Sequence, residues 1–164
     1  MNIGIDKFGL AIPEFFLDIR DLAVARNENA NKFLKGLLQL EMSVSPVTQD
    51  IVTLGATAAH EFLTEEDKKK IDMVIIGTET GVDQSKSASV FIHNLLGIQP
   101  FARCIEIKEA CYGATAGLDF AKKHIENNPD SYVLLIASDI AKYGIGTSGE
   151  STQGSGSCAM LIKK

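Results

Sequence analysis

The stretch Met73-Val74-Ile75-Ile76-Gly77 is an unbroken run of apolar residues, and it decides the class of fold. A strand that is apolar on both faces is typical of a sheet that helices cover on both sides. A second such run, Val133-Leu134-Leu135-Ile136, lies within the segment 132–138, which we also expect to be a strand. Segments with helical spacing alternate with these strands, so the sequence predicts an α/β fold.

Working outward from these two runs, the remaining elements follow from the spacing of apolar residues. We expect further strands near 3–8, 102–108 and 157–162, and helices near 18–26, 31–38, 51–62, 85–96 and 112–125. The segment 139–156 is rich in Gly, Ser and Thr and is expected to be a long loop. Because only this loop precedes the last strand, that strand is expected to lie antiparallel to its neighbour. The sequence thus predicts one domain, 1–164, with a mostly parallel, mixed five-stranded sheet and helices on both faces.

The composition excludes several classes of function. The chain has 164 residues, of which 45% are hydrophobic and 23% charged, as in ordinary globular domains. A net charge of −5 argues against nucleic acid or an anionic membrane as a partner. No stretch approaches the roughly 18 apolar residues of a membrane span. Three scattered cysteines indicate reduced thiols and no metal site, so we expect a cytoplasmic protein.

The segment Lys108-Glu109-Ala110-Cys111-Tyr112-Gly113 places a cysteine where a strand ends and a helix begins. The first N–H groups of a helix lack internal partners, and the helix dipole adds partial positive charge there. Both effects favour a thiolate, so Cys111 is a candidate nucleophile. A buried, inert cysteine is the alternative that the local sequence leaves open. Cys104 and Cys158 lie inside strand patterns and are expected to be inert.

Glu79 follows the apolar run that ends at Gly77. Active sites of α/β sheets collect at the carboxyl ends of strands, where a carboxylate can exchange protons with a substrate. A solvated loop glutamate is the competing interpretation. The three histidines, His60, His93 and His124, fall within predicted helices and are expected to be ordinary surface or packed residues. No histidine is therefore predicted beside Cys111.

Several segments together resemble bacterial hydroxymethylglutaryl-CoA synthase, a family of the thiolase superfamily. They are Glu79 with its strand and the runs 45–50, 92–97, 108–115 and 149–156, and the similarity extends in register from Met1 to Lys164. The resemblance implies a thiolase-like fold and a reaction in three parts. Cys111 would accept an acetyl group from acetyl-CoA, and Glu79 would remove a proton from the acetyl methyl group. The resulting carbon would attack acetoacetyl-CoA, and water would release the product.

The resemblance also implies which residues meet the substrates. Thr152 and Tyr143 match substrate-binding positions, and the region 29–35 matches a stretch near the nucleotide of CoA. The two CoA thioesters are substrates, and no further cofactor is implied.

The family is much longer than this chain, and its second half carries the catalytic histidine and much of the acetoacetyl-CoA pocket. We therefore expect 1–164 to be the N-terminal thiolase-like domain of such a synthase, incapable of full turnover by itself, with the C-terminal half absent or supplied elsewhere. An apolar face left uncovered would favour a homo-oligomer, such as a dimer.

Two alternatives remain open. One is another condensing enzyme of the superfamily, such as a ketoacyl synthase, which would pair His and Asn with its cysteine. The other is a non-catalytic half-domain that binds CoA or a partner chain. Acetylation of Cys111 by acetyl-CoA would support the synthase, whereas an unmodified thiol in a chain that still binds CoA would support the non-catalytic half-domain.

Overall fold

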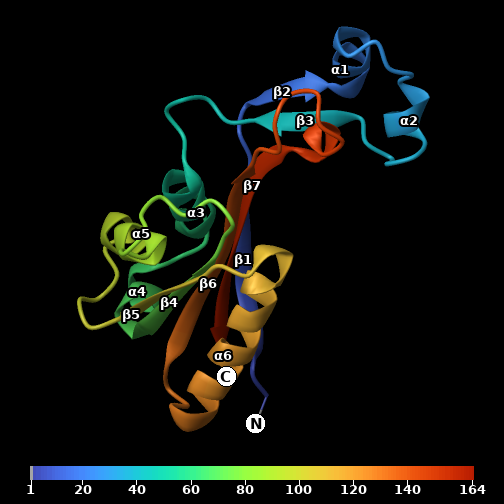
Figure 1. Ribbon diagram of the computed structural model, residues 1–164. Helices are drawn as coiled ribbons and strands as arrows, with labels where there is room; N and C mark the ends of the chain where they lie inside the picture. The colour runs from blue at the N-terminus through green and yellow to red at the C-terminus, as the bar shows by residue number, and fades with distance from the viewer. Residues whose placement is uncertain (1) are drawn as a thin grey trace.

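A computed structural model describes residues 2–164 and shows a main body with an arm extending from one end (Figure 1). The body is built on a five-stranded sheet. In spatial order its strands are β1 (Gly4–Ala11), β7 (Gly154–Lys163), β6 (Tyr132–Ala141), β4 (Ile71–Gly77) and β5 (Arg103–Ile107). The predicted number of strands in this sheet is confirmed.

The direction of the strands changes across the sheet. Strand β4 pairs in parallel with β5 and β6, whereas β6 with β7 and β7 with β1 are antiparallel. The mixed sheet and the antiparallel last strand are therefore confirmed. Four of the five strands run in the same direction and only β7 opposes them, so the prediction of a mostly parallel sheet is confirmed as well. Strand β7 returns from β6 through a loop, and β1 then adds antiparallel to the outer edge of β7.

Helices cover both faces of the sheet, as predicted. On one face lie α3 (Ile51–His60) and α5 (Ala88–Leu96), and on the other lies α6 (Gly113–Asn127). Side chains of β4 alternate between the two layers: Ile76 packs toward α3 and α5, and Ile75 packs toward α6. Both isoleucines are fully buried, and burial of each such side chain stabilises the folded chain by about 1.5 to 3 kcal/mol.

The ends of these helices carry residues that are typical of helix caps. Asp50 caps α3 by accepting a hydrogen bond from Thr53 N at 2.8 Å. Helix α5 ends at Gly97, which has a φ of 64° and adopts the left-handed conformation that glycine favours. A further short helix, α4 (Glu65–Lys70), precedes β4, with its acidic residues in the first turn and its lysines in the last. This helix was not predicted as a separate element.

The arm consists of a hairpin-like pair of strands and two short helices (blue and cyan in Figure 1). Its elements are β2 (Phe15–Asp18), α1 (Ile19–Ala25), α2 (Asn31–Leu34) and β3 (Glu41–Val44). The two strands, antiparallel to one another, were not predicted. The helix predicted over 31–38 ends at Leu34, and the chain then turns through Leu38, whose φ is 54°. A small core of Ile19, Leu22, Ala23 and Phe33 holds the arm together.

The segment predicted as a loop over 139–156 is shorter in the structure. Strand β6 continues to Ala141 and β7 begins at Gly154, because Asp139 pairs with Gly156 and Ala141 with Gly154. The remaining loop contains a single 3-10 turn, η2 (Glu150–Thr152). Across residues 2–164, none of the helices has both the length and the apolar character that crossing a bilayer requires.

Candidate active site

The loop after β4 carries Glu79, and a carboxylate on the neighbouring strand β6 binds this loop. Asp139 of β6 accepts hydrogen bonds from the backbone N–H of Glu79 at 3.0 Å and of Thr80 at 3.1 Å. It also accepts from the hydroxyl of Thr80 at 2.7 Å and of Thr78 at 3.1 Å. Four donors on one carboxylate fix the backbone of this loop, because charge-assisted hydrogen bonds are stronger than neutral ones.

Cys111 follows β5, the strand that pairs with β4 on the side opposite β6. Strand β5 ends at Ile107, and a 3-10 turn, η1 (Ala110–Tyr112), leads directly into α6. The cysteine is therefore at a helix entrance, as predicted, with one tight turn before the α-helix begins. Ala110 has a φ of 43°, a left-handed conformation that is strained for a residue with a side chain.

A close contact between glycines brings this turn onto the end of β4. A Cβ on Gly77 would collide with the backbone nitrogen of Ala114 and lie 2.8 Å from the carbonyl carbon of Gly113. Only glycine at position 77 allows the first turn of α6 to approach this closely. The contact sets the distance between the Cys111 turn and the loop that begins after Gly77.

The two predicted catalytic side chains meet at this junction. The Sγ atom of Cys111 lies 3.9 Å from Oε1 of Glu79 and is oriented to donate a hydrogen bond to it. Both residues are exposed, so the pair is open to a ligand arriving from solvent. The arrangement places a thiol and a carboxylate face to face, a geometry that suits proton removal from a group bound to the sulfur.

The two predicted substrate-binding residues lie elsewhere, in the loop between β6 and β7. The hydroxyl of Thr152 donates to the carbonyl of Gly149 at 2.8 Å, and the backbone N–H of Tyr143 donates to the side-chain oxygen of Gln153 at 2.7 Å. Within residues 2–164, neither residue makes a hydrogen bond to Glu79 or Cys111. The structure therefore brings the catalytic pair together but does not join these two residues to it.

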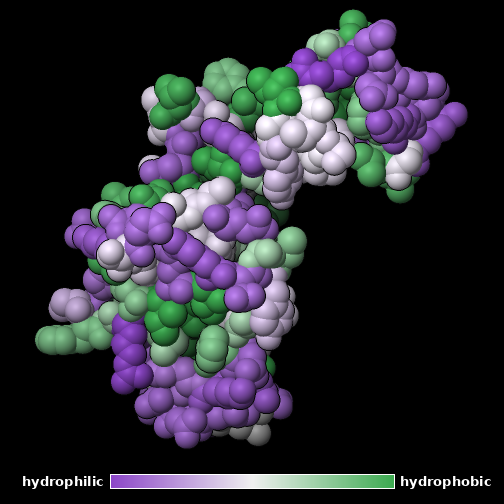
Figure 2. Space-filling model, in the orientation of Figure 1, coloured by the Kyte–Doolittle hydropathy of each residue, from purple (hydrophilic) through white to green (hydrophobic). Residues whose placement is uncertain are grey.

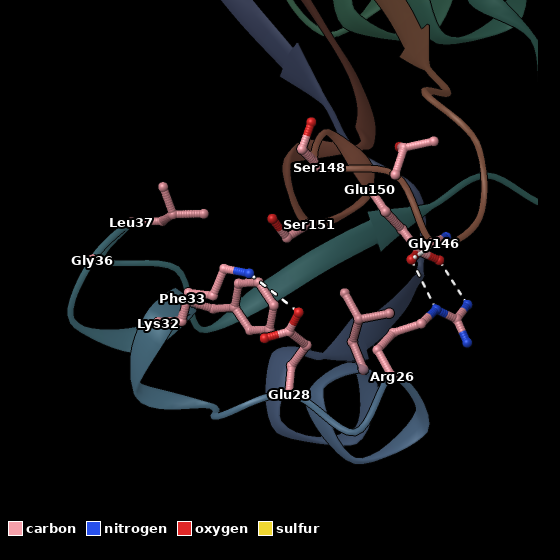
Figure 3. Close-up of a pocket in the computed structure, with 12 residues that line it drawn as sticks. Arg26, Glu28, Lys32, Phe33, Gly36, Leu37, Gly146, Ser148, Glu150 and Ser151 are labelled. Carbon is pink, nitrogen blue, oxygen red and sulfur yellow. Dashed lines mark hydrogen bonds and ion pairs between the residues drawn. The ribbon is translucent and has the colours of Figure 1, made fainter.

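A cavity of about 560 Å³ lies between the arm and this same loop (Figure 3). The arm lines it with Leu22, Arg26, Glu28, Lys32, Phe33, Gly36 and Leu37, and the loop lines it with Gly146, Thr147, Ser148, Glu150 and Ser151. Part of the predicted nucleotide region, 29–35, thus contributes to its wall.

An ion pair joins the two sides of this cavity. The guanidinium of Arg26 donates to both carboxylate oxygens of Glu150, at 2.8 and 2.6 Å (dashed in Figure 3). Glu150 also accepts from the backbone N–H of Gly146 at 2.8 Å. The hydrogen bonds from Arg26, and then that from Gly146, lower the pKa of Glu150 from 4.5 to about 2. The carboxylate is therefore ionised at neutral pH and ties the loop to the arm.

His124, His93 and Cys104 lie away from the Cys111 turn and have structural contacts of their own. The Nε2 atom of His124 lies 3.0 Å from Asp72 at the far end of α6, and that of His93 lies 2.9 Å from the carbonyl of Gln99. In the described part of the chain, no histidine is hydrogen-bonded to Cys111. Burial raises the pKa of the Cys104 thiol, which fits the expectation that it is inert.

Sequence analysis missed two contributors to these sites. Asp139 was assigned to a loop, although an aspartate at the end of an apolar strand next to the Glu79 strand is the signal that could have identified it. The Arg26–Glu150 pair joins residues 124 positions apart, and no local pattern indicates it.

The family model for the N-terminal part of hydroxymethylglutaryl-coenzyme A synthase matches residues 1–164. The hydroxymethylglutaryl-CoA synthase of Enterococcus faecalis is 56% identical over 162 residues, which are 99% of this chain and 42% of that protein. The polyketide-biosynthesis 3-hydroxy-3-methylglutaryl-ACP synthase PksG of Bacillus subtilis is 33% identical over 177 residues. This match covers 99% of this chain and 42% of that protein.

Solved structures agree with these matches. A crystal structure of an HMG-CoA synthase complexed with CoA superposes with a TM-score of 0.98 at 62% identity, covering 100% of this chain and 42% of the other. The HMG synthase of the curacin biosynthetic pathway, in complex with an acetyl donor-ACP, superposes with a TM-score of 0.92 at 32% identity. This match covers 99% of this chain and 41% of the other. The chain thus spans about two fifths of the length of these relatives. It belongs to the hydroxymethylglutaryl-coenzyme A synthase family of the thiolase superfamily, of which it represents the N-terminal part.

Proposed function

We propose that this chain supplies the acetyl-cysteine half of a hydroxymethylglutaryl-CoA synthase, an acyltransferase. The observation that carries the proposal is the distance of 3.9 Å between the sulfur of Cys111 and the carboxylate of Glu79. In the first step, the Cys111 thiolate attacks the thioester carbonyl of acetyl-CoA, and CoA leaves as its thiol after taking up a proton. The acetyl group is then bound as a thioester beside a carboxylate.

The next steps use that carboxylate as a base. A thioester makes its methyl protons acidic, and Glu79 takes one of them, leaving an enolate carbon. This carbon forms a bond to the ketone carbon of acetoacetyl-CoA, and the ketone oxygen takes up a proton to become a hydroxyl. Water then hydrolyses the thioester to Cys111, which releases hydroxymethylglutaryl-CoA and restores the thiol. Asp139 serves this sequence by fixing the backbone of Glu79.

The cavity between the arm and the β6–β7 loop is our candidate for the nucleotide end of CoA. It is lined by Arg26 and Lys32, and the ammonium of Lys32 belongs to a side chain that is 62% exposed. The ammonium of Lys32 pairs with Glu28 at 3.2 Å, and an ion pair this exposed is weak enough for a phosphate-bearing ligand to compete for the cation. A structural relative that was solved in complex with CoA supports CoA as the ligand of this chain. We assign Tyr143 and Thr152, on the loop beside this cavity, to contacts with the substrate.

Incubation with acetyl-CoA tests the proposal directly. We expect mass spectrometry to find one acetyl group on the peptide that contains Cys111, and none in Cys111→Ser. In D₂O, the bound acetyl methyl should exchange its protons for deuterium in the wild-type chain, whereas Glu79→Gln should be acetylated without exchange. An unmodified thiol in a chain that still binds CoA would overturn the proposal and favour a non-catalytic module that binds CoA or a partner chain.

Complete turnover is not expected from residues 1–164 alone. In their described part, no histidine reaches Cys111, and the relatives are more than twice as long. The second half, from the same or another polypeptide, would supply the missing groups. The same interpretation assigns the reaction to the mevalonate route of isoprenoid biosynthesis, in the cytoplasm, with the two CoA thioesters as its only small-molecule requirements. A ketoacyl synthase remains the rival enzyme, and loss of methyl exchange in Glu79→Gln would count against it.

A further inference from the structure

The loop that carries Glu79 is held on both sides. Strand β4 lies between β6 and β5 in the sheet, so the loop that leaves its end passes between these two neighbours. On the β6 side, Asp139 binds the loop at Glu79 and Thr80. On the β5 side, a second carboxylate, that of Glu106, lies against the same loop.

Glu106 is a buried carboxylate. Its side chain is only 7% exposed, and its Oε2 atom accepts a hydrogen bond of 2.6 Å from the backbone N–H of Ala88, the first residue of α5. Its Oε1 atom lies 3.3 Å from the ammonium of Lys108 but has no hydrogen-bond partner among residues 2–164. Lys108 compensates the charge of this carboxylate, and the hydrogen bond from Ala88 ties β5 to the end of the segment that leads from β4 into α5.

The unsatisfied oxygen lies directly under the loop. A Cβ added to Gly81 would collide with Oε1 of Glu106 and lie 2.9 Å from Nζ of Lys108. The same Nζ is 3.5 Å from the backbone carbonyl of Asp83. Lys108 therefore binds the loop at Asp83, while Glu106 lies against it near Gly81 and binds its end at Ala88, where α5 begins.

The pair also lies on the segment that leads to the nucleophile. Strand β5 passes from Glu106 through Lys108 into the 3-10 turn that contains Cys111. Any shift of the loop relative to this segment changes the separation of Glu79 and Cys111. We propose that Glu106, together with Lys108, is a positioning residue that keeps the carboxylate of Glu79 against the sulfur of Cys111. This inference rests on the proposed roles of Glu79 and Cys111 and explains how their separation is maintained.

The position of Glu79 can be measured through the charge that Cys111 meets. Iodoacetamide is neutral and iodoacetate is an anion, and both alkylate the thiolate. A carboxylate close to the sulfur repels the anion, so the ratio of the iodoacetate rate to the iodoacetamide rate reports that charge. We expect Glu79→Gln to raise this ratio by roughly threefold to tenfold, which corresponds to one unit charge removed from about 4 Å in water.

If Glu106 acts by position, Glu106→Gln raises the ratio in the same direction, and the double variant with Glu79→Gln equals Glu79→Gln alone. Gly81→Ala leaves every charge in place but adds a methyl group where the ends of the Glu106 and Lys108 side chains now lie, so it disturbs their contacts with the loop, and we expect it to raise the ratio too. An unchanged ratio in both Glu106→Gln and Gly81→Ala would overturn the inference. A rise from Glu106→Gln that persists in full without Glu79 would also overturn it, because the effect would then come from the charge of Glu106 itself.

Glu109→Gln is the matched control. Glu109 is exposed, carries the same charge and lies two residues before Cys111, and its side chain has no hydrogen bond or ion pair in the described part of the chain. Whatever its effect on the ratio, that effect should be the same with and without Glu79. Should Glu106→Gln fail to fold, Glu106→Asp, which keeps the charge but shortens its reach, takes its place. The measurement uses no CoA thioester, so its outcome is independent of whether the chain is acetylated.

Discussion

The thiol of Cys111 faces the carboxylate of Glu79 across 3.9 Å, although 32 residues separate them in the chain. The two residues follow neighbouring parallel strands, β4 and β5, whose carboxyl ends meet at one edge of the sheet. Parallel pairing thus brings the thiol and the carboxylate, which are distant in the sequence, into contact at the edge where active sites of such sheets collect.

Gly77→Ala should separate the pair and destabilise the chain. The added methyl group meets the backbone of Gly113 and Ala114, which cannot move as a flexible side chain could. We expect a loss of about 1 to 3 kcal/mol in the free energy of unfolding, measured by urea denaturation, and slower acetylation of Cys111. Gly4→Ala is the control, since nothing lies within 4 Å of the added atom. Equal stability of the two variants would contradict the close contact.

Asp139→Asn should loosen the Glu79 loop. The amide keeps one acceptor oxygen but turns an NH₂ group toward donors that the carboxylate now satisfies. We expect the variant to lose about 1 to 3 kcal/mol of stability, and the acetyl methyl group to exchange more slowly in D₂O. Asp130→Asn, at an exposed position before β6, should leave both quantities unchanged. Normal exchange in Asp139→Asn would show that Glu79 keeps its place without this carboxylate.

The elements around the site could be predicted from sequence because their signals are local. The apolar run from Met73 to Gly77 predicts β4, and small residues after Cys111 predict the start of α6. Each signal depends on neighbours along the chain. For that reason the sequence also indicated both predicted catalytic side chains.

The contributions that sequence analysis missed depend on contacts between distant segments. Strands β2 and β3 have only four residues each and form because they pair with one another. The end of β6 at Ala141 is likewise set by pairing with Gly154, on the far side of a loop. Glu106 alternates like any strand residue, and only the folded chain places it under Gly81. Tertiary pairing overrides local propensity at each of these points.

The Arg26–Glu150 ion pair should make the arm sensitive to acid. The pKa of Glu150 is lowered from 4.5 to about 2 in the folded chain, so its ionisation stabilises the fold above pH 4.5. That contribution is lost progressively as the pH falls from 4.5 towards 2, because the unfolded state then binds the proton more readily. We expect the thermal midpoint of the wild-type chain to fall more steeply across this range than that of Glu150→Gln.

The exposed Glu28, whose side chain is 44% exposed, supplies the control for that measurement. Glu28→Gln should retain the steep acid dependence of the wild-type chain. Parallel curves for the wild-type chain and Glu150→Gln would contradict the assignment of the acid response to this ion pair.

The apolar surface of β1 should drive association of the chain. Gly9 faces α3, so its neighbours Phe8 and Leu10 point to the opposite face, where they are 66% and 58% exposed, and Ile12 beyond them is 75% exposed. Apolar colour is visible on both the arm and the body in Figure 2. Because contiguous apolar surface favours burial against another protein surface, we expect sedimentation to detect dimers or larger species at high concentration. Leu10→Lys should shift the population toward monomer, whereas Val24→Lys, at an apolar position on the arm that is 81% exposed, should not. A wild-type chain that stays monomeric at every concentration would show that this surface is tolerated in water.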